Sequence, residues 1–514
     1  CEIIRQLSVS GINMWRNIYN VSNKLQSGQA FITLLFIAQI SPAQTSKPAT
    51  PFVPVTDQML EHPNPADWLT WRATPNGWGY SHLKQITPAN VRTLALVWSR
   101  PLGPGIQETT PLVYNGVLYI ASPNDLIQMI DARTGELKGQ HRRPLPRDLN
   151  DFFPAPAGRK RNIAIYGNTI VSAAADSVLY AVSIETGKIV WQTQIEDYKK
   201  GTIQSSGPII AGGRAISGRG CSPYETSETC AITAHDVKTG KELWRTQTIP
   251  RGGEPGDESW GGVPWEKRRH VGAWMPATYD PELDMIFIGT SVTSPAPKFM
   301  LGGNDKKYLY HNCTLAIDAK TGKVKWFYQH LVDHWDLDHA FERMLVDTQV
   351  APDVKDVPWR NPRLKHGERR RVVTGIPGKS GIVYTLDRET GEFLWARPTV
   401  VQNVVSRIDG ATGQVTENPE VLFDKIGDER LVCPSSHGGK DWQAGAYDPV
   451  ANVMFQPLQN TCMKTTAIKE EKPFYAIKRE FQLSPGVETI GTIYAVSIAT
   501  GRTIWKFENR GATS

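Results

Sequence analysis

The sequence is poor in cysteine and in long apolar runs, and each shortage excludes a class of protein. Cysteine accounts for 6 of 514 residues and no C-x-x-C-H segment occurs, which excludes a covalently attached c-type haem within this sequence. The apolar run Ala30 to Ile40 is shorter than the roughly 20 residues that a membrane-spanning helix needs. The net charge of +6 is modest, and the basic run His366 to Arg371 is typical of a solvated loop. Nothing therefore indicates a nucleic-acid-binding module.

An eleven-residue pattern recurs along the chain and sets the expected architecture. Each copy has a strand-like apolar run, an Asp or Ser followed by x-x-Thr-Gly, and a second strand that ends in Trp. The Gly supplies the positive φ of a tight turn, and the constant Trp predicts docking of each unit against the next. Five copies with Trp occupy residues 181–191, 234–244, 316–326, 385–395 and 495–505; residues 129–139 form a copy without Trp, and residues 409–413 match the turn alone.

The spacing of the copies favours a β-propeller over a regular solenoid. Successive turns lie 53, 82 and 69 residues apart, measured from Thr186 through Thr239 and Thr321 to Thr390. Four-stranded blades with loops of variable length accommodate such uneven spacing. Helical periodicity is weak beyond the N-terminus, and 44 glycines with 36 prolines suit a turn-rich chain. The sequence therefore predicts an all-β fold.

The two ends of the sequence lie outside this repeat. Residues 14–43 read as an export signal, with a basic start, an apolar centre at Ala30 to Ile40 and a small-residue cleavage site, although a buried apolar segment stays an alternative. Because the sequence begins with Cys1, residues 1–45 are expected to be an export signal or a non-native leader, and residues 46–66 a linker. The propeller is expected over residues 67–514, with its last blade lying outside the sequence, and the location is expected to be periplasmic.

The cysteines agree with an exported protein. Cys221 and Cys230 bracket a short loop, and Cys433 and Cys462 flank a loop-rich segment. We predict two disulfides from these pairs and a free Cys313, since disulfides persist in oxidising compartments. Five reduced, buried thiols are the alternative.

An unusual density of ionisable groups marks residues 330–339, which read HLVDHWDLDH. On an extended segment Asp336 and Asp338 point the same way, and two close carboxylates raise each other's pKa. Such a pair suits a general base or a site for a hard cation. The interleaved Trp335 and Leu337 argue against a solvated surface loop.

Three further candidates lie elsewhere in the chain. Lys379, between glycines ahead of a predicted strand, could hold a carboxylate or an oxyanion, although a solvated turn lysine is the alternative. Trp442 follows two glycines that allow close approach of a ligand. Trp274, in a stretch rich in Gly and Trp, could stack on a planar cofactor, although a core position is the alternative.

The repeated phrase resembles the tryptophan-docking motif of the PQQ-dependent quinoprotein dehydrogenases, which comprise methanol/ethanol-type alcohol dehydrogenases and membrane glucose dehydrogenases. The resemblance extends from Asp67 to Trp505. It implies an eight-bladed propeller that binds PQQ and oxidises an alcohol or sugar hydroxyl by hydride transfer. It also implies a periplasmic enzyme, either free or membrane-associated, that passes electrons to an external acceptor such as a cytochrome c or a quinone.

The resemblance also implies roles for individual residues. Asp336 would take the alcohol proton, Asp336 and Asp338 would bind Ca²⁺ or a lanthanide, and Lys379 would contact the quinone oxygens. The Cys433–Cys462 pair matches a disulfide of the family. The other implied PQQ-binding residues are Glu108, Arg161, Ser205, Trp274, Asp441 and Trp442.

Several departures from the family pattern keep alternatives open. The adjacent-cysteine pair that packs over PQQ is absent, and Asp441 stands where the family has Asn. Ser217–Gly220 lacks the metal-binding Glu, and Ser291-Val292 replaces the metal-binding Asn. A non-catalytic propeller that serves as a binding scaffold is therefore the alternative function. Altered metal use, with Glu225 or Glu228 as extra ligands, is a further hypothesis.

Overall fold

A computed structural model describes residues 52–512 apart from residues 153–158, 203, 225–226 and 472–473. The expected export signal, residues 1–45, lies outside the described residues. Residues from Phe52 onward form one compact unit, so the boundary expected at residue 67 falls inside it. In the expected linker, Val55 bridges to Gly167 and Leu60 is buried on helix α1 (Asp57–Glu61). No helix among the described residues is long and apolar enough to cross a membrane.

Six antiparallel sheets, five of four strands and one of five, make up most of the described chain. The first three are β1 (Leu112–Tyr114), β2 (Val117–Ser122), β3 (Leu126–Asp131) and β4 (Leu137–Arg142); β5 (Ala164–Tyr166), β6 (Thr169–Ala173), β7 (Val178–Ser183) and β8 (Ile189–Gln194); and β9 (Ile209–Ala211), β10 (Arg214–Ser217), β11 (Ala231–Asp236) and β12 (Glu242–Gln247).

The other three sheets follow in the same manner, and their strands also pair largely in chain order. They are β13 (Thr278–Asp280), β14 (Met285–Gly289), β15 (Cys313–Asp318) and β16 (Val324–Gln329); β17 (Met344–Val350), β19 (Glu368–Gly375), β20 (Ile382–Asp387), β21 (Phe393–Pro398) and β18 (Trp359–Arg360); and β25 (Ala446–Asp448), β26 (Val453–Gln459), β29 (Gly491–Ser497) and β30 (Thr503–Asn509).

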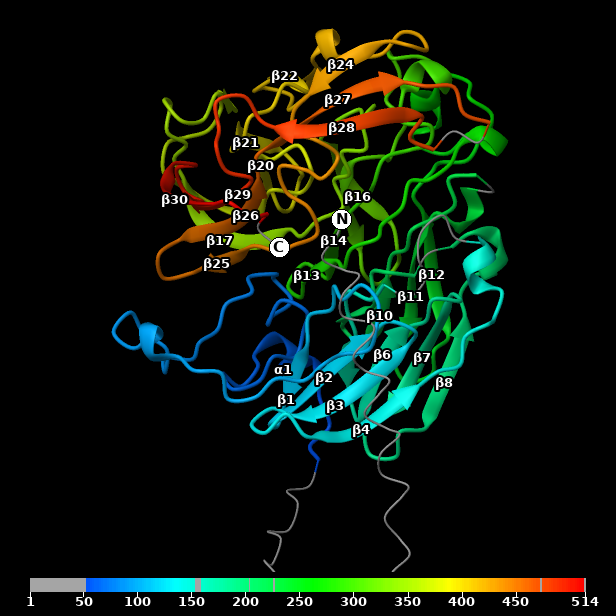
Figure 1. Cartoon of the computed structure of the whole chain (residues 1–514), viewed down its shortest axis with the longest axis vertical. Coiled ribbons are helices and arrows are strands. Elements are labelled where there is room, and N and C mark those ends of the chain that lie inside the picture. Colours follow the sequence, from blue (N-terminus) through cyan, green and yellow to red (C-terminus); the bar gives the residue numbers. More distant parts are fainter. Residues whose placement is uncertain (1–51, 153–158, 203, 225–226, 472–473, 513–514) are drawn as a thin grey trace, which may run out of the picture. The chain divides into compact units, whose positions relative to one another are not determined.

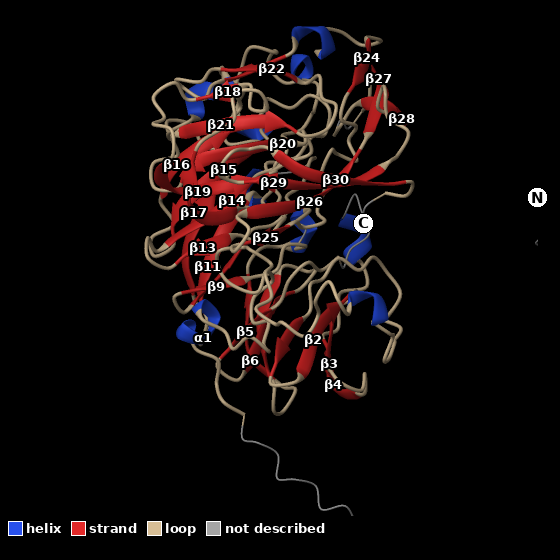
Figure 2. Ribbon diagram, turned by 90° about the vertical axis from the view of Figure 1, so that its left-hand side faces the viewer, coloured by secondary structure: helices blue, strands red, loops and turns tan. Residues whose placement is uncertain are grey.

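Two small sheets are inserted into this part of the chain: their first three strands lie between the last two large sheets, and their last two strands lie between β26 and β29 of the last one. A hairpin of β22 (Val405–Ile408) and β23 (Val415–Glu417) carries the turn at residues 409–413. A three-stranded sheet pairs in the order β24 (Glu429–Val432), β27 (Thr461–Ala467) and β28 (Ile477–Leu483), and we call it the cap sheet. Strands dominate every view, and the few helical turns are short (Figure 1, Figure 2). The predicted all-β propeller architecture is confirmed, with six blade-like sheets among the described residues.

The recurrent Thr-Gly turn explains how neighbouring sheets fit together. In the third sheet the Asp236 carboxylate accepts hydrogen bonds from the backbone N–H of residues 238 and 239, at 3.1 and 2.8 Å, and so closes the turn. Trp244 then donates its indole N–H to the Ala319 carbonyl of the next sheet at 2.9 Å. A Cβ on Gly322, where φ is +75°, would lie 2.7 Å from the Trp244 ring. The Gly is therefore required both by the turn and by the docked Trp.

The same contact joins other neighbours. Trp191 donates to Val237 at 3.0 Å, and Trp326 donates to Arg388 at 3.3 Å. Trp98, which precedes the first sheet, donates to Ala132 at 3.1 Å. The predicted role of the constant Trp in docking one unit on the next is confirmed at Trp191, Trp244 and Trp326, whereas Trp505 is half exposed.

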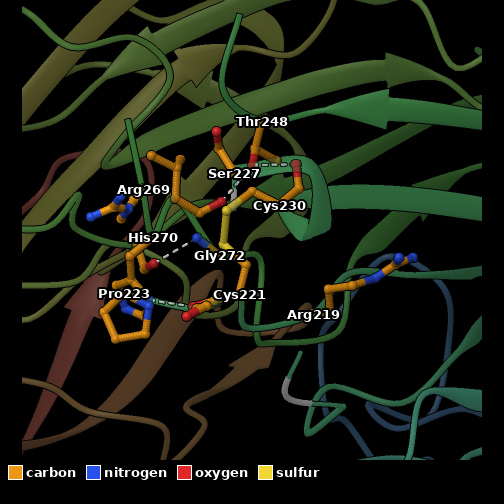
Figure 3. Close-up of a disulfide and its surroundings, with 12 residues drawn as sticks. Arg219, Cys221, Pro223, Ser227, Cys230, Thr248, Arg269, His270 and Gly272 are labelled. Atoms are coloured by element: carbon orange, nitrogen blue, oxygen red, sulfur yellow. Dashed lines mark hydrogen bonds between the residues drawn. A yellow bond between two sulfur atoms is a disulfide. The ribbon is translucent and has the colours of Figure 1, made fainter. Parts of the chain in front are cut away.

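Both predicted disulfides form, and Cys313 is free and buried. Figure 3 shows the Cys221–Cys230 bond and its surroundings. The Thr248 hydroxyl donates to the Cys230 carbonyl at 3.0 Å, and the His270 ring lies 2.6 Å from the Cys221 carbonyl. The Cys433–Cys462 bond joins the end of β24 to β27, so it fastens the cap sheet.

Candidate functional site

The acidic segment 330–339 is a buried loop between β16 and β17. Asp333 organises it, because its carboxylate accepts the backbone N–H of Trp335 at 2.7 Å and of Leu337 at 2.5 Å. Trp335 is fully buried and donates its indole N–H to the Val421 carbonyl at 2.9 Å. The expectation that this is no solvated loop is confirmed. Asp333 thus shapes the loop, and Asp336 lies on it with a φ of +73°.

Lys379 lies against both remaining carboxylates of the loop. Its Nζ donates to Asp336 Oδ1 at 3.1 Å and is 3.8 Å from Asp338 Oδ2. The backbone fixes this position, since Lys379 N–H donates to the Asp338 carbonyl at 2.9 Å and Gly439 N–H donates to the Lys379 carbonyl at 2.7 Å. Lys379 is also buried. The fold therefore brings together an acid and a lysine that lie 43 residues apart.

Trp274 extends the cluster toward a second pair of charges. Its indole N–H donates to Asp338 Oδ2 at 3.2 Å. The Arg161 guanidinium lies 4.5 Å from the centre of the Trp274 ring, and its Nη2 is 2.5 Å from Glu108 Oε2. The predicted residues Glu108, Arg161, Trp274, Asp338, Lys379 and Asp336 therefore form one continuous series of contacts.

The other predicted residues differ in how closely they approach this series. Asp441 is partly buried and interacts electrostatically with Lys379, Arg161 and Asp338. Trp442 is partly buried and packs on the apolar cluster that also contacts Trp274. Ser205 is buried, and the structure shows no hydrogen bond from it to the cluster among the described residues.

The burial of so many charges shifts their pKa values. Burial raises the pKa of Asp336 to about 7, because it outweighs the opposing effect of Lys379, and Asp338 adds to the rise. Burial lowers the pKa of Lys379, but Asp336 and Asp338 outweigh it and raise that pKa overall. Burial likewise raises the pKa of Asp441. Strongly shifted groups gathered in one buried place are typical of functional sites.

Sequence reasoning missed Arg479, which reaches the cluster from strand β28 of the cap sheet. Its Nη1 is 3.3 Å from Asp336 Oδ2, and its guanidinium lies 4.4 Å from the centre of the Tyr475 ring. In the sequence it belongs to a run of three charged residues, Lys478 to Glu480, that is typical of an exposed strand. No local signal separates it from its neighbours, because only the packing of the cap sheet brings it to Asp336.

Around Asp336, the described donors do not by themselves make up a metal site. Both oxygens of Asp336 face cations, and those of Asp338 accept N–H groups from Val292 and Trp274 at 2.8 and 3.2 Å. No group of three or more His, Cys, Asp or Glu side chains in the described part of the chain is placed to hold a metal ion. Glu228 is half exposed and lies near Lys200, and Glu225 lies outside the described residues. Metal binding by Asp336 and Asp338 stays a prediction.

The same residues do fit a planar, anionic cofactor. Trp274 offers an indole ring, and four cations surround the series of contacts: Arg159, Arg161, Lys379 and Arg479. Two buried donors of these arginines, Arg159 Nε and Arg161 Nε, have no hydrogen-bond partner among the described residues. An unpaired buried donor is costly, so carboxylate and carbonyl oxygens of a ligand would stabilise it.

Comparison with known proteins agrees with this chemistry. The sequence profile of the PQQ family described as "Glucose/ethanol/alcohol dehydrogenase, beta-propeller domain" matches residues 68–419. Quinohemoprotein alcohol dehydrogenase ADH-IIG of Pseudomonas putida is 28% identical over 411 residues, which are 76% of this chain and 54% of that protein. Quinoprotein alcohol dehydrogenase PedH, also of P. putida, is 26% identical over 488 residues, 88% of this chain and 77% of that protein.

Solved structures share the fold. A europium-containing methanol dehydrogenase superposes with a TM-score of 0.78 at 24% identity and covers 89% of this chain and 81% of its own. At this identity the likeness establishes the fold alone. The chain spans about half the length of ADH-IIG, the quinohemoprotein relative.

Proposed function

This chain belongs to the PQQ-dependent glucose/ethanol/alcohol dehydrogenase family, and from that premise we propose that it oxidises an alcohol with PQQ as the hydride acceptor. The observation that carries the proposal is the buried Asp336, 3.1 Å from Lys379, on a loop that a second acid organises. Burying three charged side chains is costly, and packing alone does not require them. A sugar hydroxyl is an alternative substrate within the same chemistry.

The cofactor would be held by residues that already contact one another. The Trp274 ring would take the flat face of PQQ, and Arg161 and Lys379 would pair with its carboxylate and carbonyl oxygens. Arg161 now lies over the Trp274 ring, so it would have to turn aside from the ring to admit a planar group there. When bound, PQQ supplies a quinone that accepts two electrons and a proton as hydride.

Asp336 would act as the general base. Its carboxylate accepts the proton of the substrate hydroxyl, and the carbon that bears the oxygen releases its hydrogen with the bonding electron pair. The alcohol thereby becomes an aldehyde or ketone, the proton resides on Asp336, and the electron pair leaves the substrate. Lys379 lies 3.1 Å from that carboxylate and would stabilise the negative charge that develops on the quinone oxygens.

We propose a periplasmic location and an external electron acceptor, such as a cytochrome c or a quinone. The two disulfides and the signal-like residues 14–43 support export. A metal ion, Ca²⁺ or a lanthanide, would need ligand oxygens beyond those of Asp336 and Asp338. No step in the proposed reaction depends on it.

A non-catalytic binding scaffold is the second candidate. Ser217–Gly220 and Ser291-Val292 lack the family's metal ligands, and both oxygens of Asp336 face cations, which is compatible with a purely structural ion-pair cluster. The unpartnered donors of Arg159 and Arg161 favour the dehydrogenase, because a structural cluster gains nothing from leaving them unpaired.

Cofactor binding tests the proposal before any turnover is assayed. PQQ is titrated into the purified protein with Ca²⁺, with La³⁺ and with EDTA, and the quenching of tryptophan fluorescence is recorded. Dye reduction is then followed with primary alcohols and with sugars. We expect saturable quenching that Trp274→Leu weakens, followed by reduction of the dye with an alcohol. If the folded protein binds no PQQ under any of these conditions, the dehydrogenase proposal is wrong and the binding scaffold is favoured.

A further inference from the structure

The cap sheet places an arginine directly beside the candidate base. Strand β28 pairs with β27, which the Cys433–Cys462 bond fastens to the end of β24. From β28, Arg479 Nη1 lies 3.3 Å from Asp336 Oδ2, and its side chain is 19% exposed. Figure 1 shows the cap sheet as a separate layer at the top of the view. An inserted sheet, rather than a blade, thus completes the surroundings of Asp336.

Arg479 is held in place, yet part of its hydrogen-bonding capacity is unused. Its guanidinium stacks on Tyr475 at 4.4 Å, and the Tyr475 ring stacks on Phe474 at 3.8 Å. Its Nε and Nη2 are buried and have no hydrogen-bond partner among the described residues. Nε and Nη2 lie on the same side of a guanidinium, and two parallel N–H groups of this kind match the two oxygens of a carboxylate.

Arg479 and the candidate cofactor residues approach Asp336 through different carboxylate oxygens. Lys379 contacts Asp336 Oδ1 and approaches Asp338, which in turn accepts the Trp274 N–H. Arg479 contacts the other oxygen, Oδ2. A ligand held by Arg479 would therefore sit next to the proton acceptor, where a substrate must bind, and not on the indole ring.

We propose that Arg479 is a specificity-determining residue that binds the carboxylate of an alcohol substrate through Nε and Nη2. The preferred substrate class is then a short hydroxy-carboxylate, and this inference rests on the proposed dehydrogenase function. Because Arg479 touches Asp336, the hydroxyl and carboxylate of the substrate must lie within about 5 to 6 Å of each other, given ordinary hydrogen-bond lengths. A hydroxyl and a carboxylate separated by three methylene groups can reach this distance.

A matched pair of substrates tests this subsite. The ratio of kcat/KM for 4-hydroxybutanoate to that for 1,4-butanediol is measured with PQQ-loaded protein, since the diol replaces the carboxylate with a neutral hydroxymethyl group. We expect the protein to prefer the hydroxy-carboxylate and Arg479→Gln to reduce that preference by about 10- to 100-fold, the range for charge-assisted hydrogen bonds. Arg479→Lys should restore part of it, because the charge remains while the paired donors are lost.

Lys478→Gln is the matched control. Lys478 precedes Arg479 on β28, its side chain is 68% exposed, and it pairs with Glu480. It carries the same charge on the opposite side of the strand, so the substrate preference should not change. A fall of the same size in this variant would show a long-range charge effect and would overturn the subsite.

Binding of an unreactive analogue provides a readout that does not depend on turnover. Butanoate is titrated calorimetrically into the PQQ-loaded protein, and binding should be lost in Arg479→Gln. Equal butanoate binding by that variant, or no preference between the two substrates in the unaltered protein, would contradict the proposal.

A loss of PQQ affinity in Arg479→Gln with unchanged substrate preference would assign the donors to the cofactor instead. If no alcohol is oxidised, the dehydrogenase proposal fails, and the butanoate titration still decides the subsite.

Discussion

At the scale of single residues, the structure separates acids that look alike in the sequence. The Asp333 carboxylate accepts hydrogen bonds from two backbone N–H groups, whereas the Asp336 carboxylate contacts Lys379 and Arg479. The spacing predicted that Asp336 and Asp338 point the same way, and the resemblance pointed to Lys379, Trp274, Arg161 and Glu108. It could not reveal Arg479, because a contact between a strand of the cap sheet and a distant loop leaves no local pattern.

Lys379 is the residue whose loss should affect the reaction most after Asp336. Lys379→Gln removes the cation 3.1 Å from Asp336 Oδ1 and leaves two buried carboxylates less compensated. We expect kcat/KM for the best alcohol to fall by about 100- to 1000-fold, the usual effect of removing an electrostatic stabiliser from an active site. Steady-state dye reduction measures it, and Lys355→Gln, on an exposed loop, is the control. Equal rates for the two variants would exclude a catalytic role for Lys379.

His235 gives a pH-dependent prediction away from the site. Burial lowers its pKa to about 4, despite Glu242 at 3.6 Å, which opposes the shift. The unfolded chain binds this proton below about pH 6.5, so between the two values the unfolded state takes up more protons and acid lowers stability. In His235→Phe this contribution disappears. When the pH falls from about 7 to about 4.5, the unaltered protein should lose about 2 to 3 kcal/mol more unfolding free energy than His235→Phe. Denaturant titrations at both pH values measure it, and a constant difference would contradict the lowered pKa.

At the scale of structural elements, the repeat was predictable because its chemistry is local. An Asp or Ser, a Thr and a Gly close each turn within a few residues, so the pattern is visible in sequence. The cap sheet was not predictable in this way. Twenty-eight residues separate the end of strand β24 from the start of strand β27, and no repeated motif marks either strand. The fold at this level follows from long-range pairing, which sequence spacing does not specify.

Two glycines of equivalent turns allow the docking contact to be measured. Gly322→Ala would place a Cβ 2.7 Å from the Trp244 ring, whereas Gly187 has open space at the same turn position because the preceding repeat lacks Trp. Both positions have a positive φ, so both variants share the backbone strain. We expect Gly322→Ala to cost about 1 to 3 kcal/mol more than Gly187→Ala, the usual penalty of overpacking. Urea unfolding measures the difference, and equal losses would show that the Trp contact adds nothing.

At the scale of the whole molecule, the repeat predicted the all-β propeller and the cysteine positions predicted both disulfides, and the structure confirms them. Repetition made this possible, since one local motif recurs often enough to specify the architecture. The candidate site residues Asp336 and Arg479, by contrast, lie on a loop and on an inserted strand that no repeated motif specifies. The 5-stranded sheet and the cap sheet are examples of such departures from a regular repeat.

Breaking the Cys433–Cys462 bond should affect stability and substrate choice together. The bond closes a segment of 29 residues, for which chain-entropy arguments give about 3 to 4 kcal/mol of stabilisation. A Cys433→Ser/Cys462→Ser double variant should lose that amount in urea unfolding and should also lose preference for a carboxylate, because Arg479 is carried by the same sheet. The corresponding double variant of Cys221 and Cys230 is the comparison, since it should lose stability and keep the preference. If the Cys433/Cys462 variant loses stability but keeps its preference for a carboxylate substrate, Arg479 does not bind the substrate.

The central claim is that Asp336 is the base of a PQQ-dependent alcohol oxidation. Its most direct test is kcat/KM for an alcohol in Asp336→Asn, with the PQQ dissociation constant measured on the same samples. Asp347→Asn, in β17 with a side chain 47% exposed, is the control. We predict a fall of about 10²- to 10⁴-fold, the range for loss of a general base, with PQQ still bound. An Asp336→Asn protein that binds PQQ and oxidises alcohol at the rate of the unaltered protein would contradict the claim.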